Sequence, residues 1–346
     1  MSTTFEHKKH VAFWLRCLRM LPQSYTSGDT QRMTLGYFCL SGLDLLGGVQ
    51  SKVPDEERKE LVNWIYAQQI SASAGGGFRG SPCHAVSSGA QGSSHITMCY
   101  NALQNLAILR DDLVRVERDA LKHFISSCQN GDGSFSPSPG QAERDARFVY
   151  CAFALCDMLD VWSCIDVEAA VRFLLQSCNA DGGFGQGPGQ ESQGGSTYCA
   201  LASLSLSSRL DQLQDKERSV DWLLSRQQSG SGFNGRPEKA TDTCYSFWCG
   251  ASLEILGKHE LIDSPSDVAW LLSAQTRVGG IAKTPEDMPD VMHSYLSHAA
   301  LAMHLPSMKE EAGGEGSLMV LEGLQRLEPR WNLSVQSAEW LRNHIR

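Results

Sequence analysis

The chain has 346 residues, of which 42% are hydrophobic, and it carries a formal net charge of -9 at pH 7. This acidic balance argues against a nucleic-acid-binding protein, which usually presents a basic face, and suits a basic partner or substrate. No run of 18 or more apolar residues occurs, and the first residues lack the basic and apolar stretches of a secretory signal. We therefore expect a cytoplasmic protein with no stable membrane insertion.

Twelve helices are predicted, in alternating pairs. The first helix of each pair is amphipathic, whereas the second carries few charges and is apolar almost all round, as expected of a helix buried on every side. Several of the twelve cysteines, such as Cys151 and Cys156, lie in these apolar stretches, so we expect reduced thiols. The outer helices are predicted near 8–20, 55–70, 115–129, 165–178, 216–228 and 265–275, and their inner partners near 32–47, 95–109, 145–159, 195–207, 241–256 and 290–303.

A glycine-rich turn recurs between the helices of a pair. The apolar residues that end these turns are spaced by 57, 49, 49 and 48 residues, and they are Phe78, Phe135, Phe184, Phe233 and Ile281. A repeat of two helices can stack into a solenoid or close into a ring. Six pairs suffice for an all-α fold of the α6–α6 barrel type (an α/α toroid) around a central cavity, in one domain spanning 1–346. Two terminal helices, near 317–326 and 335–345, would follow a flexible loop near 308–316.

The starts of the inner helices carry reactive side chains, which would line the cavity: His95, Arg147, Asp242, Cys244, Tyr245 and His293. The alternative is a noncatalytic helical-repeat scaffold, which is the commoner use of such repeats. A scaffold would instead present varied polar residues on its concave face. The concentration of reactive types favours an enzyme.

Three of these residues suit a metal ion. Asp242 and Cys244 begin the fifth inner helix and His293 begins the sixth, so the ring would bring a carboxylate, a thiolate and an imidazole together. Three such ligands leave a tetrahedral zinc ion one open position, which indicates catalysis. Just before them, Arg236 and Lys239 lie on a loop. With Tyr245 they suit the diphosphate of a lipid bound in an apolar cavity.

These residues also carry a resemblance that covers nearly the whole chain. Gly-Arg-Pro-Glu-Lys at 235–239, Asp-Thr-Cys-Tyr-Ser-Phe-Trp at 242–248, Gly-Gly at 279–280 and Asp-x-x-His at 290–293 together resemble the signature of protein prenyltransferase β subunits. The resemblance implies an obligate α subunit and zinc held by Asp242, Cys244 and His293. It also implies attack by the cysteine thiolate of a C-terminal Cys-a-a-X motif on an isoprenoid diphosphate, with Arg236, Lys239 and Tyr245 stabilising the leaving group.

Within this family the sequence is most similar to the type I geranylgeranyl subunits. Farnesyltransferase-like members have Trp at the end of the isoprenoid pocket, where this chain has Thr34, and the smaller side chain leaves room for one further isoprene unit. Phe38 would line the same wall. Lys283 stands where farnesyl and Rab-type subunits carry Asp, which supports magnesium in farnesyltransferases, so we expect turnover without magnesium.

The protein substrate is expected to be a Cys-a-a-X protein such as a Rho- or Rac-like small GTPase, whose basic tail suits an acidic surface. By resemblance, its last residue would lie near His95, Thr97, Phe148 and Met292, with Arg147 near the peptide and the cavity wall. A terminal Leu or Phe is expected.

One departure from the family pattern is Gln193, at a position where the family has a His that contacts the diphosphate. The amide can donate a hydrogen bond but carries no charge, and we expect binding to survive on the remaining cations. The nearest enzymatic alternative is a Rab-type geranylgeranyltransferase β subunit, which also has a small residue in the pocket. A terpene cyclase is a more distant alternative, because it would need acidic clusters or a cavity Asp as proton donor and would not have the zinc trio.

Overall fold

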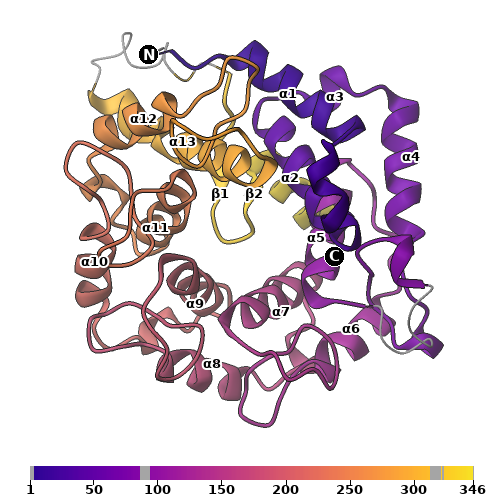
Figure 1. Ribbon diagram of the computed structural model, residues 1–346. Coiled ribbons are helices and arrows are strands. Elements are labelled where there is room, and N and C mark those ends of the chain that lie inside the picture. Colours follow the sequence, from indigo (N-terminus) through magenta and orange to yellow (C-terminus); the bar gives the residue numbers. More distant parts are fainter. Residues whose placement is uncertain (1–3, 86–93, 312–320, 322, 346) are drawn as a thin grey trace.

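The computed structural model describes residues 4–85, 94–311, 321 and 323–345. Its helices form a closed ring in two layers, with one helix of each pair outside and the other facing the centre (Figure 1). This arrangement confirms the predicted α/α toroid of six helix pairs. The outer helices are α1 (His7–Arg19), α4 (Asp55–Tyr66), α6 (Arg118–Ser127), α8 (Val167–Gln176), α10 (Lys216–Leu224) and α12 (Ser264–Ser273). The inner helices are α2 (Arg32–Leu45), α5 (Ile96–Ile108), α7 (Ala146–Leu159), α9 (Gly194–Leu206), α11 (Thr243–Ile255) and α13 (Val291–Glu311).

The predicted helix positions agree closely with these bounds. A short helix that was not predicted, α3 (Val49–Lys52), leads from α2 to α4. The last inner helix continues to Glu311 instead of ending near 303, so the first residues of the expected loop at 308–316 are helical. The remainder of that loop lies outside the described residues.

Glutamines at the ends of several outer helices join one repeat to the next, although Cys178 takes this position after α8. The side chain of Gln129 donates to the carbonyl of Asp166 at 2.8 Å and accepts from its N–H at 2.8 Å. Gln227 makes the same pair of bonds with Asp263. Gln275, in the last repeat, accepts from the N–H of Glu6 at 2.9 Å and donates to the carbonyl of Thr4 at 3.2 Å. The bond that links neighbours elsewhere therefore also links the last repeat to the first.

The glycines of the turns are required by close backbone contact. Gly133 has a φ of 89°, and a Cβ there would lie 2.1 Å from the carbonyl oxygen of Ala169 on the next outer helix. Gly279 has a φ of 82°, and its Cβ would lie 2.1 Å from the carbonyl oxygen of Lys9. Because only glycine tolerates both conditions, these turns fix how closely consecutive repeats approach. The apolar residues that end the turns are all fully buried: Phe78, Phe135, Phe184, Phe233 and Ile281.

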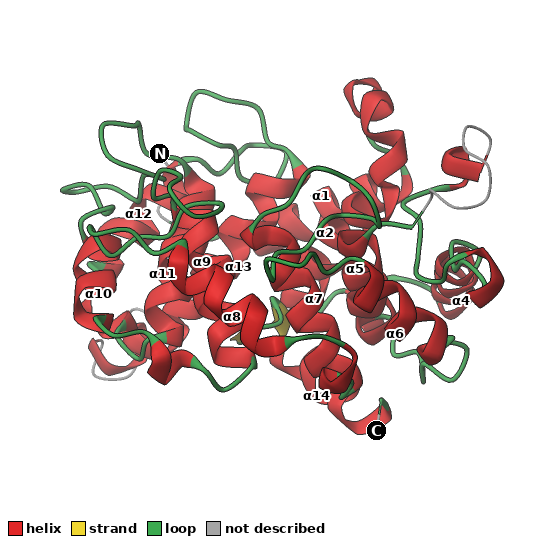
Figure 2. Ribbon diagram, turned by 90° about the horizontal axis from the view of Figure 1, so that it is seen from below, coloured by secondary structure: helices red, strands yellow, loops and turns green. Residues whose placement is uncertain are grey.

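A C-terminal hairpin occupies the middle of the ring. Strands β1 (Leu327–Glu328) and β2 (Leu333–Ser334) pair antiparallel, and α14 (Val335–His344) follows them at one edge of the ring (Figures 1 and 2). The terminal helix predicted near 335–345 is thus confirmed. The helix predicted near 317–326 is wrong for residues 323–326, which form a turn and irregular chain; most of the rest lies outside the described residues.

Tyrosines from five inner helices hold the tip of this hairpin. Their hydroxyls donate to four consecutive backbone carbonyls: Tyr198 to Pro329 at 2.7 Å, Tyr150 to Arg330 at 3.0 Å, Tyr100 to Trp331 at 2.7 Å, and Tyr37 and Tyr295 to Asn332 at 2.6 and 2.9 Å. The corresponding residue of α11 is Phe247, which is also fully buried. Satisfying buried carbonyls in this way stabilises a non-repetitive segment inside an apolar ring.

The structure also bears on membrane-spanning segments and on the cysteines. Across the described residues, no helix has both the length and the apolar character needed to cross a membrane. All twelve cysteines are free thiols.

Candidate active site

The inner helices begin with side chains that cap them. His95, Asp145, Gln193, Asp242 and Asp290 each accept a hydrogen bond from a backbone N–H two or three residues further on. Such caps satisfy N–H groups that the first helical turn leaves without partners. Since the caps recur with the period of the repeat, the side chains at the helix starts gather at one rim of the ring.

The predicted metal ligands meet at this rim. One donor atom from each of Asp242, Cys244 and His293 lies within 4.8 Å of the others. His293 Nε2 lies 3.3 Å from Asp242 Oδ1, and Cys244, in the first turn of α11, is buried. A carboxylate oxygen, a thiol sulfur and an imidazole nitrogen on two adjacent helices make a donor set that suits zinc with one position open.

The electrostatics of this cluster favour a cation. Burial raises the pKa of the Cys244 thiol far above its usual range, and the charge of Asp242 adds to the shift. Burial alone would lower the pKa of His293, but hydrogen bonds to Asp242 and Asp290 outweigh it and raise that pKa to about 9. Although burial disfavours its charge, hydrogen bonds from His293 and Cys244 hold the pKa of Asp242 below its usual value. The cluster thus holds protons that a divalent cation would replace.

A further residue, Asp290, orients the histidine, a role that the sequence analysis did not assign to it. Its Oδ2 lies 2.6 Å from His293 Nδ1, while its Oδ1 accepts from the N–H groups of Met292 and His293 at 2.9 Å. A partner at Nδ1 fixes the tautomer and leaves Nε2 for a metal. The Asp-x-x-His spacing in the sequence was the signal for this contact.

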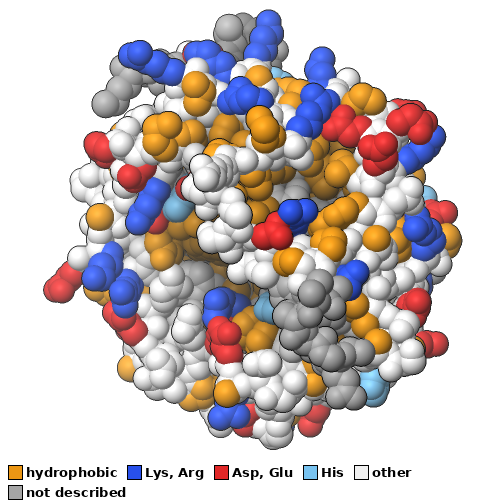
Figure 3. Space-filling view, turned by 45° about the vertical axis from the view of Figure 1, so that its right-hand side comes forward, with side chains coloured by type: hydrophobic (Ala, Val, Ile, Leu, Met, Phe, Trp, Pro, Cys, Tyr) orange, Lys and Arg blue, Asp and Glu red, His pale blue; other side chains and the backbone are white. Residues whose placement is uncertain are grey.

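A cavity of about 540 Å³ lies beside the cluster and gathers four of the predicted residues: Arg147, Gln193, Arg236 and Tyr245. Gln193 Nε2 donates to the Tyr245 hydroxyl at 2.7 Å, and Arg236 forms an ion pair with Glu191. Arg147 pairs with Asp145 at 2.6 Å. Hydrophobic side chains line the hollow at the middle of the ring (Figure 3).

Two of the predicted cations lie elsewhere. Lys239 is exposed on the loop that follows Arg236. Lys283 lies with its Nζ 4.0 Å from Asp242 Oδ2, and therefore beside the candidate metal ligands. Seven residues that line the cavity were not predicted as site residues: Gln186, Gln190, Glu191, Gly195, Ser196, Cys199 and Trp248. Cys199 and Trp248 are 49 residues apart, at equivalent positions of the repeat, and this spacing could have identified them.

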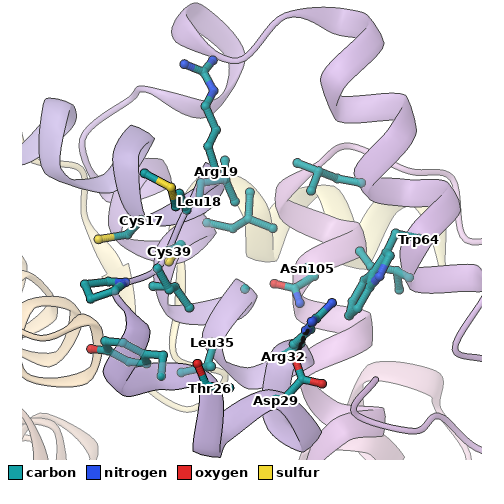
Figure 4. A pocket seen from close by; sticks show the side chains of 18 of the residues that line it. Cys17, Leu18, Arg19, Thr26, Asp29, Arg32, Leu35, Cys39, Trp64 and Asn105 are labelled. Carbon is teal, nitrogen blue, oxygen red and sulfur yellow. Dashed lines mark hydrogen bonds and ion pairs between the residues drawn. The ribbon is translucent and has the colours of Figure 1, made fainter. Parts of the chain in front are cut away.

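Thr34 and Phe38 belong to α2. The Thr34 hydroxyl donates to Asn101 Oδ1 at 2.6 Å, and the Phe38 ring centroid lies 5.9 Å from that of Tyr295. Other residues of α2, among them Leu35 and Cys39, line a second cavity of about 460 Å³ between α1, α2 and α4 (Figure 4). Asp29 and Arg32 form an ion pair at its edge. Thr34 and Phe38 are not among the residues that line it.

The predicted peptide-binding residues fall into two groups. His95 caps α5 through Nδ1, its ring lies 5.9 Å from that of Phe148, and the Thr97 hydroxyl lies 3.5 Å from Cys151 Sγ. Met292 lies at the start of α13, 37% exposed. The first group joins α5 to α7, whereas Met292 lies beside the candidate metal ligand His293.

Comparison with known proteins agrees with this fold and identifies the family. The prenyltransferase α-α toroid domain matches residues 5–333, and the chain belongs to that family. It is 37% identical over 286 residues to the geranylgeranyl transferase type-1 subunit beta of Arabidopsis thaliana, covering 76% of this chain and 75% of that protein. The Dictyostelium discoideum protein of the same name is 38% identical over 291 residues, covering 77% of this chain and 81% of that protein.

More distant similarity extends to farnesyltransferases. The protein farnesyltransferase subunit beta of Schizosaccharomyces pombe is 31% identical over 260 residues, covering 74% of this chain and 63% of that protein. Among solved structures, Candida albicans protein geranylgeranyltransferase-I complexed with GGPP matches with a TM-score of 0.88 at 27% identity, over 99% of this chain and 100% of that one. The predicted membership of the prenyltransferases is confirmed. The two type-1 relatives are more similar to this chain than the farnesyl subunit is.

Proposed function

We propose that the chain is the β subunit of a protein geranylgeranyltransferase type I. It would transfer a geranylgeranyl group from geranylgeranyl diphosphate to the cysteine of a C-terminal Cys-a-a-X motif, in a heterodimer with an α subunit. The observation that carries the proposal is the convergence of Asp242, Cys244 and His293 beside a cavity lined by Gln193, Arg236 and Tyr245. The similarity to type-1 β subunits supports the same reaction.

Asp242, Cys244 and His293 would hold zinc, and Asp290 would fix the orientation of the His293 ring. When bound, zinc would keep the substrate thiol ionised at neutral pH. The thiolate then displaces diphosphate from C1 of the isoprenoid, and no general base is needed. Tyr245, oriented by Gln193, and Arg236 would stabilise the charge that develops on the leaving group, with Lys239 on the same loop as Arg236 as a further cation.

Two residues support the type I assignment. Thr34 is small and leaves room in the isoprenoid pocket, whose wall also includes Phe38. Lys283 would place a positive charge near the diphosphate, where other subtypes use magnesium. Its ammonium group lies 4.0 Å from Asp242, close enough to act beside the candidate metal ligands. Turnover is therefore expected to require zinc and not magnesium.

His95, Thr97, Phe148 and Met292 would receive the end of the substrate peptide, with a terminal Leu or Phe preferred and with Arg147 at the cavity wall. Small GTPases of the Rho and Rac kind, with basic tails, suit the net charge of -9. Free cysteines are typical of a protein that functions in the cytoplasm.

The test is co-expression of the chain with a type I α subunit, followed by zinc analysis and a transfer assay. We expect one zinc ion per heterodimer and geranylgeranyl transfer to a Cys-a-a-Leu peptide that persists when magnesium is removed. Absence of zinc would favour a scaffold. Bound zinc without transfer to any Cys-a-a-X peptide would favour a Rab-type subunit, and loss of activity on magnesium removal would exclude the role proposed for Lys283.

A further inference from the structure

The ion pair between Arg236 and Glu191 bridges two neighbouring loops at the mouth of the cavity. Glu191 lies on the loop before α9 and Arg236 on the loop before α11, and both line the 540 Å³ cavity. The two loops are joined by a backbone hydrogen bond from the N–H of Gly194 to the carbonyl of Gly235 at 2.9 Å. The pair is thus a side-chain contact across loops that the backbone already holds together.

The position of Glu191 is set by its neighbours in the chain. The side chain of Asn179 donates to the Gln190 carbonyl at 2.8 Å and to the Ser192 hydroxyl at 2.9 Å. Ser192 in turn donates to Asp181 at 2.7 Å. These hydrogen bonds fix the residues on both sides of Glu191. The loop therefore keeps its position without the ion pair, and the Glu191 carboxylate faces Arg236.

Because solvent reaches both side chains of the ion pair, another anion can replace Glu191 as the partner of Arg236. The side chains of Arg236 and Glu191 are 42% and 61% exposed. Ion pairs at such exposure contribute little stability, because water and salt compete for both partners. A ligand diphosphate, with more charge than a carboxylate and geometry that suits a guanidinium fork, would take Arg236 from Glu191.

We propose that Glu191 is a displaceable counter-anion that holds Arg236 over the cavity, weakens the binding of diphosphate and so favours its release. The inference rests on the proposed function, since it assumes that Arg236 binds the diphosphate. Before a ligand binds, Glu191 keeps the guanidinium positioned and neutralised. Once Arg236 has moved to the diphosphate, Glu191 is left without its partner, and it recaptures Arg236 as inorganic diphosphate leaves.

The test is calorimetric titration of the full chain, co-purified with an α subunit, with inorganic diphosphate and with geranylgeranyl diphosphate. Glu191→Gln keeps the shape of the side chain and removes its charge. It should bind both ligands about two- to fivefold more tightly than the unmodified protein, the range expected when a ligand no longer competes with an exposed ion pair for Arg236. The gain should shrink as salt is raised.

Glu143→Gln is the matched control. Glu143 is an exposed carboxylate that pairs with Arg147 at 2.9 Å, on the same rim, but Arg147 keeps Asp145 as a second partner. This variant should change the affinity by less than about twofold. In an Arg236→Gln background, Glu191→Gln should have lost most of its effect, because the competition acts through that guanidinium.

Each outcome separates the inference from the proposed function. If Glu191→Gln and Glu143→Gln have equal effects, or if the gain persists without Arg236, Glu191 is not the counter-anion of Arg236. If Glu191→Gln weakens binding, its role is to shape the loop. If neither diphosphate binds to the unmodified heterodimer, the proposed function fails before the role of Glu191 is reached.

Discussion

Gln193 donates through its Nε2 to the hydroxyl of Tyr245 at 2.7 Å, while its Oε1 accepts from the N–H of Ser196 at 3.0 Å. One amide therefore caps α9 and orients a tyrosine of α11 across the candidate diphosphate site. The neutral Gln193 side chain makes both hydrogen bonds at a position where the family pattern has a His. Its role in orienting Tyr245 explains why a Gln can stand there.

Gln193→Ala should weaken diphosphate binding about two- to tenfold, because it removes a neutral hydrogen bond that orients Tyr245. Gln193→His should bind within about threefold of the unmodified protein, since the remaining cations already supply the charge. Calorimetric titration with geranylgeranyl diphosphate measures both. Sharply tighter binding by Gln193→His would show that the Gln weakened the site.

Asp290→Asn should lower zinc affinity about 10- to 100-fold, as expected when the group that orients a ligating histidine is lost. Asn caps helices nearly as well as Asp, so α13 should still form, but the amide that replaces Oδ2 is a donor facing His293 Nδ1. Titration against a chromogenic chelator measures the affinity directly. Asp287→Asn, an exposed change in the same loop, should leave the affinity unchanged; equal affinities for the two variants would remove Asp290 from the site.

Tyr150→Phe should destabilise the hairpin at the centre of the ring. The hydroxyl of Tyr150 lies 3.0 Å from the Arg330 carbonyl and within hydrogen-bonding distance of the Tyr100 and Tyr198 hydroxyls. Losing it should lower the free energy of unfolding by about 1–3 kcal/mol, the usual cost of leaving buried polar groups without a partner. Denaturant unfolding measures the loss, and faster hydrogen exchange at 330–332 would locate it. Unchanged exchange there would mean that the tyrosines do not hold the hairpin.

Substitutions at two glycines distinguish the cost of backbone strain from the cost of disturbing the packing between repeats. Gly182 and Gly189 have φ values of 94° and 75°, but a Cβ on Gly182 would lie 2.4 Å from the carbonyl oxygen of Arg218, whereas one on Gly189 would meet nothing within 4 Å. Gly189→Ala should cost about 1–2 kcal/mol from its conformation alone. Gly182→Ala should cost more than about 3 kcal/mol, because the next outer helix must also move. Similar thermal unfolding of the two variants would contradict the packing role.

The repeat explains how much of this site could be predicted from the sequence. Residues about 49 positions apart start successive inner helices, so the period of the repeat alone was enough to place Asp242, Cys244 and His293 together. The same reasoning predicted the ring and its six helix pairs. Each helix also carries its own capping residue and apolar pattern, which are local signals.

The features that could not be predicted depend on contacts between distant segments. The hairpin tip is held by hydroxyls from five helices, and residues 323–326, predicted as the end of a helix, instead lead into a strand. The pairing of Arg236 with Glu191 depends on the conformations of two rim loops, which the repeat does not specify. Lys283 lies beside Asp242 for the same reason.

The proposed function requires that the isoprenoid pocket, whose end Thr34 would form, accept a geranylgeranyl group. The most direct measurement offers the heterodimer equal concentrations of geranylgeranyl and farnesyl diphosphate with a Cys-a-a-Leu peptide, and identifies the attached lipid by mass spectrometry. We expect the geranylgeranyl product to predominate, and Thr34→Trp to shift the product toward farnesyl because the larger side chain fills the end of the pocket. A farnesylated product from the unmodified protein, or unchanged selectivity in Thr34→Trp, would contradict the account.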